Sequence, residues 1–224
     1  PTFDLVEGFW GYRAVEKTPI DLYRLGSSRD FGVAYRGKAA AGKFLVHAML
    51  GNGAGEGSEI NEGKKEMLSL AFQPTPHLVV EIYADTEERP GETDRRAVHG
   101  FIGFKGDRSR YGAEYAAQER QVPEGEEQTV TVASLFGVWD CGERFSLLAR
   151  VDHSEEGIPD AGAIPYLGLA ENAGFDLALL GLEYKIQKAI SLIPNIESVD
   201  YRESDGSPAP DSDLIARLTL YVRF

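Results

Sequence analysis

The sequence has little of three things: cysteine, long apolar runs and positive charge. Its one cysteine, Cys141, excludes an intramolecular disulfide. No stretch approaches the roughly 18 uninterrupted apolar residues of a transmembrane helix. The longest run, from Phe175 to Leu182, is broken by Asp176. The 224-residue chain therefore either stays in water or crosses a bilayer as strands, the only other structure that satisfies its own backbone there.

Positive charge is scarce relative to negative charge. The chain has 23 Lys and Arg residues against 36 Asp and Glu, a formal net charge of -13 at pH 7. Nucleic acid is disfavoured as a partner, because its phosphates need a surplus of cationic side chains. The acidic balance fits either a solvated surface or a lumen and loops that attract cations.

Strand-like segments recur at even spacing between turn residues, which is the pattern of an all-β protein. The predicted strands are 30–38, 43–51, 65–73, 78–86, 95–105, 110–120, 128–139, 144–153, 173–187, 190–201 and 213–224. Several alternate strictly; in the last, Leu218 and Leu220 lie on one face while Arg217 and Arg223 lie on the other. A soluble barrel would turn its apolar face inward and a membrane barrel outward.

The connections between these segments alternate in length. Short turns are expected at 39–42, 74–77, 106–109, 140–143 and 187–190, and long polar loops at 52–64, 86–94, 121–127, 154–173 and 202–212. Short turns on one rim and long loops on the other are typical of outer-membrane barrels, with the short side periplasmic. The pattern predicts an antiparallel up-and-down transmembrane β-barrel, with residues 1–224 in one barrel domain.

The number of predicted strands indicates whether the sequence contains a whole barrel. With the long loops outside, the first and last predicted strands both run inward, so the count of about eleven is odd, whereas a single-chain bacterial barrel has an even number. At least one strand should therefore precede residue 30, and residues 1–12 alternate poorly. We expect that earlier strands are missing and that the sequence is a C-terminal fragment.

The end of the chain resembles the C-terminal insertion signature of outer-membrane barrels: Phe224 is the last residue, with Val222 and Leu220 at alternating positions before it. Further segments resemble the bacterial porin family that includes the phosphate-selective porins (porins O and P). They are GFWGYRAVEKT (8–18), LGSSRDFGVAYRGK (25–38), GNG (51–53), LLARVD (147–152) and IPNIESVDY (193–201).

The resemblance implies a barrel of about sixteen strands in a Gram-negative outer membrane, often a homotrimer, that passes small hydrophilic solutes or ions. Its implied partners are outer-membrane lipid, the permeating solutes and the barrel-insertion machinery. It implies no cofactor or metal, and no enzymatic activity. Because this sequence is acidic and lacks a dense ladder of Lys or Arg, it favours general or cation-leaning diffusion over phosphate selectivity.

If the face of Phe224 meets lipid, the opposite parity meets water and carries the charges that set selectivity. The predicted pore-lining residues are Lys43, His47, Glu81, Asp85, Arg110, Glu114, Arg150, Asp152, Glu183, Lys185, Arg217 and Arg223.

Residues 1–29 are expected to form a loop or constriction, and the stretch 7–26 is long, aromatic and charged. Folded into the lumen, it would place Arg13, Glu16 and Lys17 near the pore axis. Alternatively it is an extracellular loop, or a strand end whose Phe9, Trp10 and Tyr12 belong to the aromatic girdle at the membrane interface.

Three other functions remain open from the residues alone. The first is a soluble lipocalin-like binding protein with an apolar internal cavity. The second is a non-conducting outer-membrane barrel that serves as an anchor or adhesin. The third is an outer-membrane enzyme, which is disfavoured because the four histidines are scattered and no G-x-S-x-G, H-E-x-x-H or P-loop motif accompanies them.

Overall fold

A computed structural model describes residues 3–27, 29–53, 55, 62–91, 93–125, 127–164, 166–203 and 208–223. The elements of these residues are α1 (Asp4–Trp10), α2 (Pro19–Leu22), β1 (Gly32–Ala39), η1 (Ala40–Gly42), β2 (Phe44–Gly51), β3 (Lys65–Thr75), β4 (Leu78–Glu87), β5 (Arg95–Lys105), β6 (Ser109–Arg120), β7 (Gln128–Asp140), β8 (Phe145–Ser154), η2 (Ala161–Ala163), β9 (Phe175–Gln187), β10 (Ile190–Tyr201) and β11 (Asp213–Val222). Every predicted strand is present, with ends within two residues of those expected.

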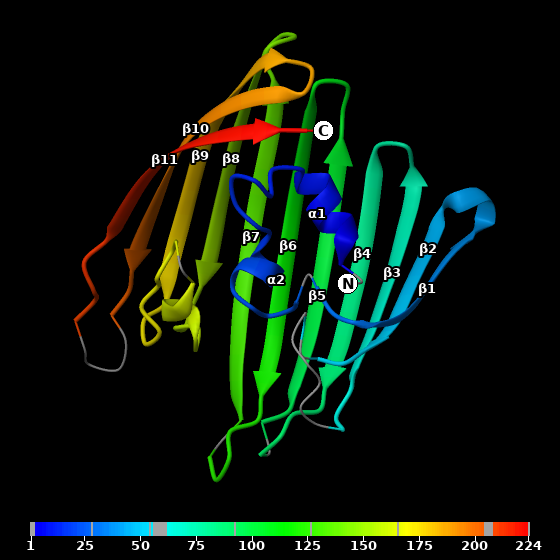
Figure 1. Cartoon of the computed structure of the whole chain (residues 1–224), viewed down its shortest axis with the longest axis vertical. Helices are drawn as coiled ribbons and strands as arrows, with labels where there is room; N and C mark the ends of the chain where they lie inside the picture. The colour runs from blue at the N-terminus through cyan, green and yellow to red at the C-terminus, as the bar shows by residue number, and fades with distance from the viewer. Residues whose placement is uncertain are drawn as a thin grey trace.

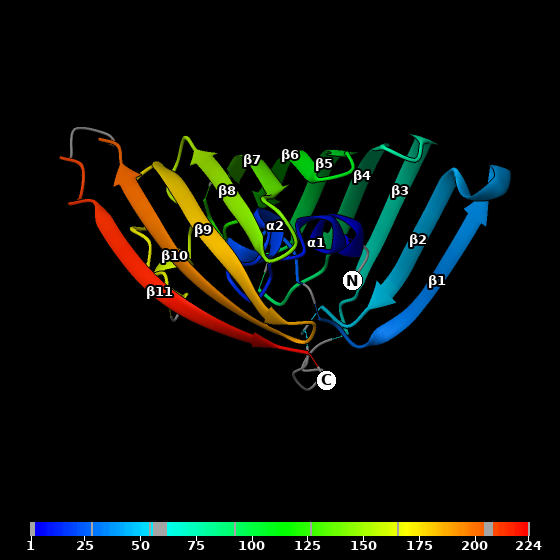
Figure 2. The ribbon, with the colours of Figure 1, turned by 90° about the horizontal axis from the view of Figure 1, so that it is seen from above.

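The strands form one sheet in sequence order, and each pairs antiparallel with the next. Short turns join them along the upper edge of Figure 1 and long connections along the lower edge, as the alternation of loop lengths predicted. Within the described residues, β1 and β11 each pair with a single strand. The expected all-β, up-and-down arrangement is therefore confirmed. Figure 2 shows the sheet curving around α1 and α2.

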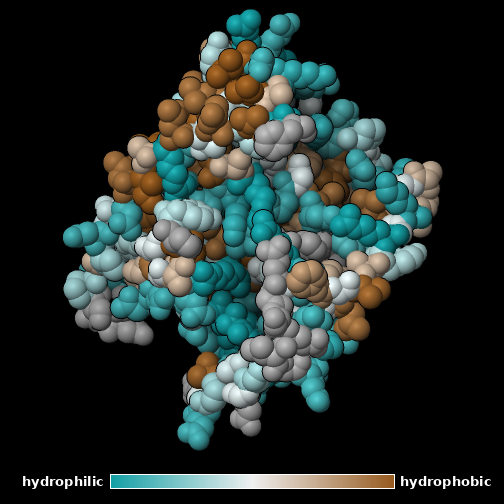
Figure 3. Space-filling model, in the orientation of Figure 1, coloured by the Kyte–Doolittle hydropathy of each residue, from teal (hydrophilic) through white to brown (hydrophobic). Residues whose placement is uncertain are grey.

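The outer face of this curved sheet is apolar. In β4, Ile82 is 59% exposed, whereas its neighbours Glu81 and Asp85 on the other parity are almost completely buried. The same alternation in β11 leaves Leu218 and Leu220 exposed and turns Arg217 inward. Figure 3, which looks into the concave side, shows hydrophilic side chains gathered in its middle and hydrophobic ones over β10, β11 and the margins. Apolar side chains thus face out, as in a membrane barrel and opposite to a soluble one.

The core of the molecule lies inside the curve of the sheet. Residues 3–26, hereafter the inner segment, bury most of their large apolar side chains there, namely Phe3, Val6, Trp10, Ile20, Leu22, Tyr23 and Leu25. The wall contributes inward apolar residues such as Val79, Phe101, Phe136, Leu148 and Leu177. Burial of each large side chain contributes about 1.5–3 kcal/mol, so the inner face is held by apolar packing as well as by polar contacts.

Two glycines make room for aromatic rings at the centre of this core. Gly103 of β5 and Gly112 of β6 are direct partners across the ladder. Beside them the Phe101 and Phe136 rings are nearly parallel, with centroids 6.3 Å apart, and Phe9 of α1 meets Phe101 edge-on at 5.3 Å. A Cβ atom on Gly112 would come within 3.0 Å of both wall rings, so only glycine fits without a shift.

We predict that Gly112→Ala lowers the free energy of unfolding by about 1–3 kcal/mol, because overpacking displaces the Phe136 and Phe101 rings. The matched control is Gly100→Ala in β5, where an added Cβ meets nothing within 4 Å. Gly100→Ala should be neutral or slightly stabilising, since it restricts only the unfolded chain. Urea unfolding of both variants in detergent measures the difference. Equal midpoints would contradict the packing described for the inner segment.

Candidate functional site

The inner segment has its own local signals for folding. Helix α1 carries Asp4 and Glu7 in its first turn, where acidic side chains favour the positive end of the helix dipole. It ends at Gly11, whose φ of 72° is the left-handed conformation of a helix C-cap and whose N–H donates to the carbonyl oxygen of Glu7. Pro19 occupies the first turn of α2, where the missing N–H is not needed. These residues favour two short helices, which lie inside the curve of the sheet.

Hydrogen bonds tie the inner segment to inward residues of the wall. The Tyr12 hydroxyl donates to Glu183 at 2.8 Å, and the Tyr23 hydroxyl donates to Asp152 at 2.7 Å. Wall side chains also donate to segment carbonyls: Arg110 to Trp10 at 2.9 Å, Gln118 to Leu25 at 2.8 Å, and Arg150 to Lys17. Burial raises the pKa of Tyr12 to about 12 and raises that of Tyr23, so both phenols remain proton donors.

Arg150 lies at the centre of this contact. Its guanidinium pairs with Asp152 at 2.6 Å, and both side chains are buried. Asp152 also accepts a hydrogen bond from Ser134 at 2.7 Å, and the Arg150 guanidinium lies over the Trp10 ring, 5.8 Å from its centroid. A buried ion pair is tolerated only when further hydrogen bonds satisfy both members. Tyr23, Ser134 and the carbonyl of Lys17 supply those bonds.

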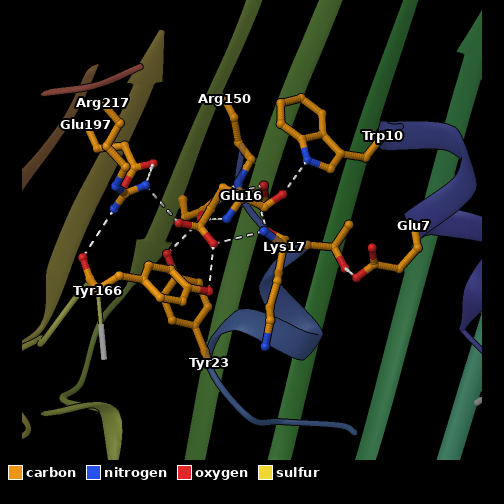
Figure 4. Close-up of polar contacts among 12 residues, drawn as sticks. Glu7, Trp10, Glu16, Lys17, Tyr23, Arg150, Tyr166, Glu197 and Arg217 are labelled. Atoms are coloured by element: carbon orange, nitrogen blue, oxygen red, sulfur yellow. Dashed lines mark hydrogen bonds and ion pairs between the residues drawn. The ribbon is translucent and has the colours of Figure 1, made fainter. Parts of the chain in front are cut away.

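Glu16 joins three parts of the chain that are far apart in sequence (Figure 4). Arg217 of β11 reaches Glu16 at 3.5 Å and Glu197 of β10 at 2.7 Å. Tyr166, in the connection between β8 and β9, donates to Glu16 at 3.2 Å. Burial raises the pKa of Glu16, while the charges of Arg150 and Arg217 act in the opposite direction. This cluster fixes the end of the inner segment to the last strands and to a long loop.

The described residues of that long loop, 155–164 and 166–174, pack inward. Ile158, Leu167 and Leu169 are buried. Arg24 of the inner segment donates to the carbonyl of Ala163 at 2.8 Å, and Arg120 of β6 donates to that of Pro159 at 3.0 Å. The loop and the inner segment together fill the part of the interior next to β4–β11, since Phe3 packs on Tyr83 of β4 and Phe9 on Phe101 of β5.

The predicted pore-lining residues lie mostly on the inner face. Inward positions of the wall are occupied by His47, Glu81, Asp85, Arg110, Glu114, Arg150, Asp152, Glu183, Lys185 and Arg217. Several are paired: Asp85 with Lys65 at 3.1 Å, Glu114 with His99 at 3.1 Å, and Lys185 with Asp140 at 3.6 Å. Their role in permeation remains a prediction.

Three predicted site residues lie at or beyond strand ends. Lys43 is exposed in the turn before β2, so its side chain does not sit within a strand of the wall. Arg223 is exposed just after β11, with its guanidinium 5.1 Å from the centroid of the Tyr221 ring. Phe224 lies outside the described residues, while Val222 and Leu220 are exposed on the outer face.

The candidate constriction residues differ from one another. Glu16 is buried, whereas Arg13 and Lys17 remain partly exposed and pair with Asp21 at 2.6 and 3.7 Å. Trp10 and Tyr12 are buried against the inner face, and Phe9 packs on Phe101. The alternative that these three aromatic residues form an interfacial girdle is therefore wrong, because a girdle faces lipid.

Sequence reasoning missed the apolar half of this contact. Val79, Tyr83 and Leu148 share the inward parity of Glu81 and Arg150, and a water-filled lumen gives them no reason to be apolar. That mismatch was the signal that something packs on the inner face.

A cavity of about 660 Å³ remains beside α1, lined by residues of β1–β6 and by Arg223. Asp4 of α1 reaches across it to Arg36 of β1 at 2.6 Å, and Arg36 donates to His47 of β2 at 3.2 Å. The free volume of the interior thus lies beside α1, where residues of β1–β6 and Arg223 line it.

No helix in the described part of the chain is long and apolar enough to cross a membrane. Over the same residues, no group of three or more His, Cys, Asp or Glu side chains is arranged to hold a metal ion.

Several solved structures share this fold. A porin superposes with a TM-score of 0.63 and 16% identity, over 90% of this chain and 64% of its own. An anion-selective porin from Comamonas acidovorans superposes with a TM-score of 0.61 and 10% identity, over 87% of this chain and 56% of its own. A loop-deletion mutant of OmpT, an outer membrane protein of Vibrio cholerae, superposes with a TM-score of 0.60 and 15% identity. The match covers 85% of this chain and 62% of the OmpT chain.

The chain spans less than two thirds of the length of each of these structures. No family model matches the sequence, and no curated protein matches it. The likeness shows an outer-membrane β-barrel fold of the porin type.

We predict that Arg150→Met lowers the free energy of unfolding by about 3–5 kcal/mol, because it leaves Asp152 buried without its cation. The double variant Arg150→Met/Asp152→Leu should recover much of that loss, since it removes both charges. Urea unfolding in detergent compares the two with the native protein. If the single variant is as stable to unfolding as the double variant, the energetic role given to the buried Arg150–Asp152 pair is wrong.

Proposed function

We propose that this chain forms the wall and constriction of an outer-membrane porin, a passive channel for small hydrophilic solutes or ions without enzymatic activity. The observation that carries the proposal is the orientation of the sheet: apolar side chains cover its outer face, and charged side chains line its inner face around the inner segment. A lipid-facing exterior with an ionic interior is the arrangement of water-filled outer-membrane barrels.

The inner segment gives this channel its constriction. It narrows the interior from the side of β4–β11 and leaves the cavity beside α1 as the route for solutes. The proposal includes an outer-membrane location, assembly into homotrimers, and recognition of the C-terminal signature Leu220, Val222 and Phe224 by the insertion machinery. The resemblance to the porin family that includes phosphate-selective members supports this class of function, and we extend it to general diffusion.

A non-conducting barrel is the second candidate, and one observation favours it. The inner segment and the described residues of the loop after β8 fill much of the interior and are fixed there by buried ionic contacts such as Arg150–Asp152. A lumen closed in this way would serve an anchor or an adhesin. The soluble lipocalin-like alternative is disfavoured, because Leu218 and Leu220 are exposed on the outer face.

Planar-bilayer recording separates these functions. We predict discrete current steps for the native protein and larger steps for Trp10→Ala/Tyr23→Ala, because loss of these buried rings loosens the constriction from the wall. The control is Tyr115→Ala, which removes an aromatic ring 53% exposed on the outer face and should leave the step size unchanged. Absence of steps in all three proteins would favour the non-conducting barrel.

A further inference from the structure

The cavity beside α1 has an excess of positive charge in an otherwise acidic protein. It is lined by two carboxylates, Asp4 and Glu81, and by five cationic side chains: Arg36, Lys38, Lys105, Arg110 and Arg223. Asp4 is already paired with Arg36, and Glu81 accepts a hydrogen bond from Ser69 at 2.5 Å. The two carboxylates offset only two of the five cations, so the cavity keeps an excess of three positive charges.

The cations of the cavity other than Arg36 differ from those elsewhere on the inner face. Arg150, Lys65 and Arg217 each pair with a carboxylate of a neighbouring position. By contrast, among the described residues no carboxylate lies within ion-pair distance of Lys38, Lys105, Arg110 or Arg223. Arg110 donates to the carbonyl of Trp10, and its Nε is buried without a hydrogen-bond partner. Four cations thus share one cavity, and none of them has an ion-pair partner among the described residues.

The topology gathers these four cations at one rim. Lys38 precedes the turn between β1 and β2, while Lys105 and Arg110 flank the turn between β5 and β6. Arg223 follows β11, at the end where Val222 pairs with the first residue of β10. All four therefore lie at the short-turn rim.

The opposite rim carries charge of the other sign. The described residues of the five long connections (52–53, 55, 62–64, 88–91, 93–94, 121–125, 127, 155–164, 166–174, 202–203 and 208–212) include 11 Asp and Glu against 3 Lys and Arg. The short-turn rim carries the four cations of the cavity, Lys38, Lys105, Arg110 and Arg223. Charge is thus segregated along the axis of the sheet, acidic at the long-loop mouth and basic at the short-turn mouth.

We propose that the channel is bipolar: its short-turn mouth binds small anions in the cavity beside α1, its long-loop mouth attracts cations, and it therefore conducts asymmetrically. This inference rests on the proposed channel function. When the long-loop side is positive, cations enter through the mouth that attracts them and anions enter through the basic cavity, so ions accumulate in the pore. When the voltage is reversed, cations and anions must each enter through the mouth that repels them, and the pore is depleted of ions.

Single-channel recording in symmetric KCl tests the inference. Currents at equal and opposite voltages should differ by about twofold in ~0.1 M KCl and converge in about 1 M, as the Debye length falls from about 10 Å to about 3 Å. The triple variant Lys38→Gln/Lys105→Gln/Arg223→Gln should lose most of this asymmetry. In a salt gradient, its reversal potential should also shift toward cations, because the anion-binding cavity has lost three charges.

The matched control is Arg108→Gln/Arg144→Gln/Lys188→Gln, which removes three exposed cations from short turns that do not line the cavity. It should keep the asymmetry and reversal potential of the native protein. Symmetric current steps in the native protein, or equal effects of the two triple variants, would overturn the bipolar channel while leaving the porin function standing. Absence of any current steps would overturn the porin function and this inference with it.

Discussion

The structure depends on the packing of the inner segment against the inward face of the sheet. Inward positions combine large apolar residues, such as Phe136 and Leu177, with buried charges such as Asp152 and Glu183. Apolar groups of the wall need a partner that excludes water, and its buried charges need donors that replace water. The inner segment supplies both, through rings such as Trp10 and hydroxyls such as that of Tyr23. The wall and the segment therefore specify one another.

This packing also decides what remains open. Because the segment and the described residues of the loop after β8 occupy the side of β4–β11, free volume is left beside α1, lined by residues of β1–β6 and by Arg223. Arg150 is paired with a carboxylate where the interior is filled, whereas Lys38 and Lys105 of the cavity have no ion-pair partner among the described residues. The charge available to a permeating ion is thus set by the uneven filling of the interior and differs from the net charge of the chain.

Much of the wall could be predicted from the sequence, because the two-residue period of a strand fixes which side chains share a face. The alternation in β4 and β11 correctly placed Glu81 and Arg217 inside and Ile82 and Leu218 outside. Alternation could not predict that Glu183 bonds to Tyr12, since the two residues are 171 positions apart and the contact depends on how the segment folds back. Alternation also assigned Lys43 to the pore wall. That residue lies in the turn before β2, where the alternation of a strand no longer decides the direction of a side chain.

Fluorescence of Trp10 tests the central claim most directly. The chain has two tryptophans, and Trp139→Phe leaves Trp10 as the only one. If the inner segment packs inside the sheet, Trp10 emission should be blue-shifted and quenched neither by acrylamide in water nor by brominated lipid. Strong quenching by acrylamide would place the segment in solvent, and strong quenching by brominated lipid would place it at the membrane interface. Either result would contradict the account.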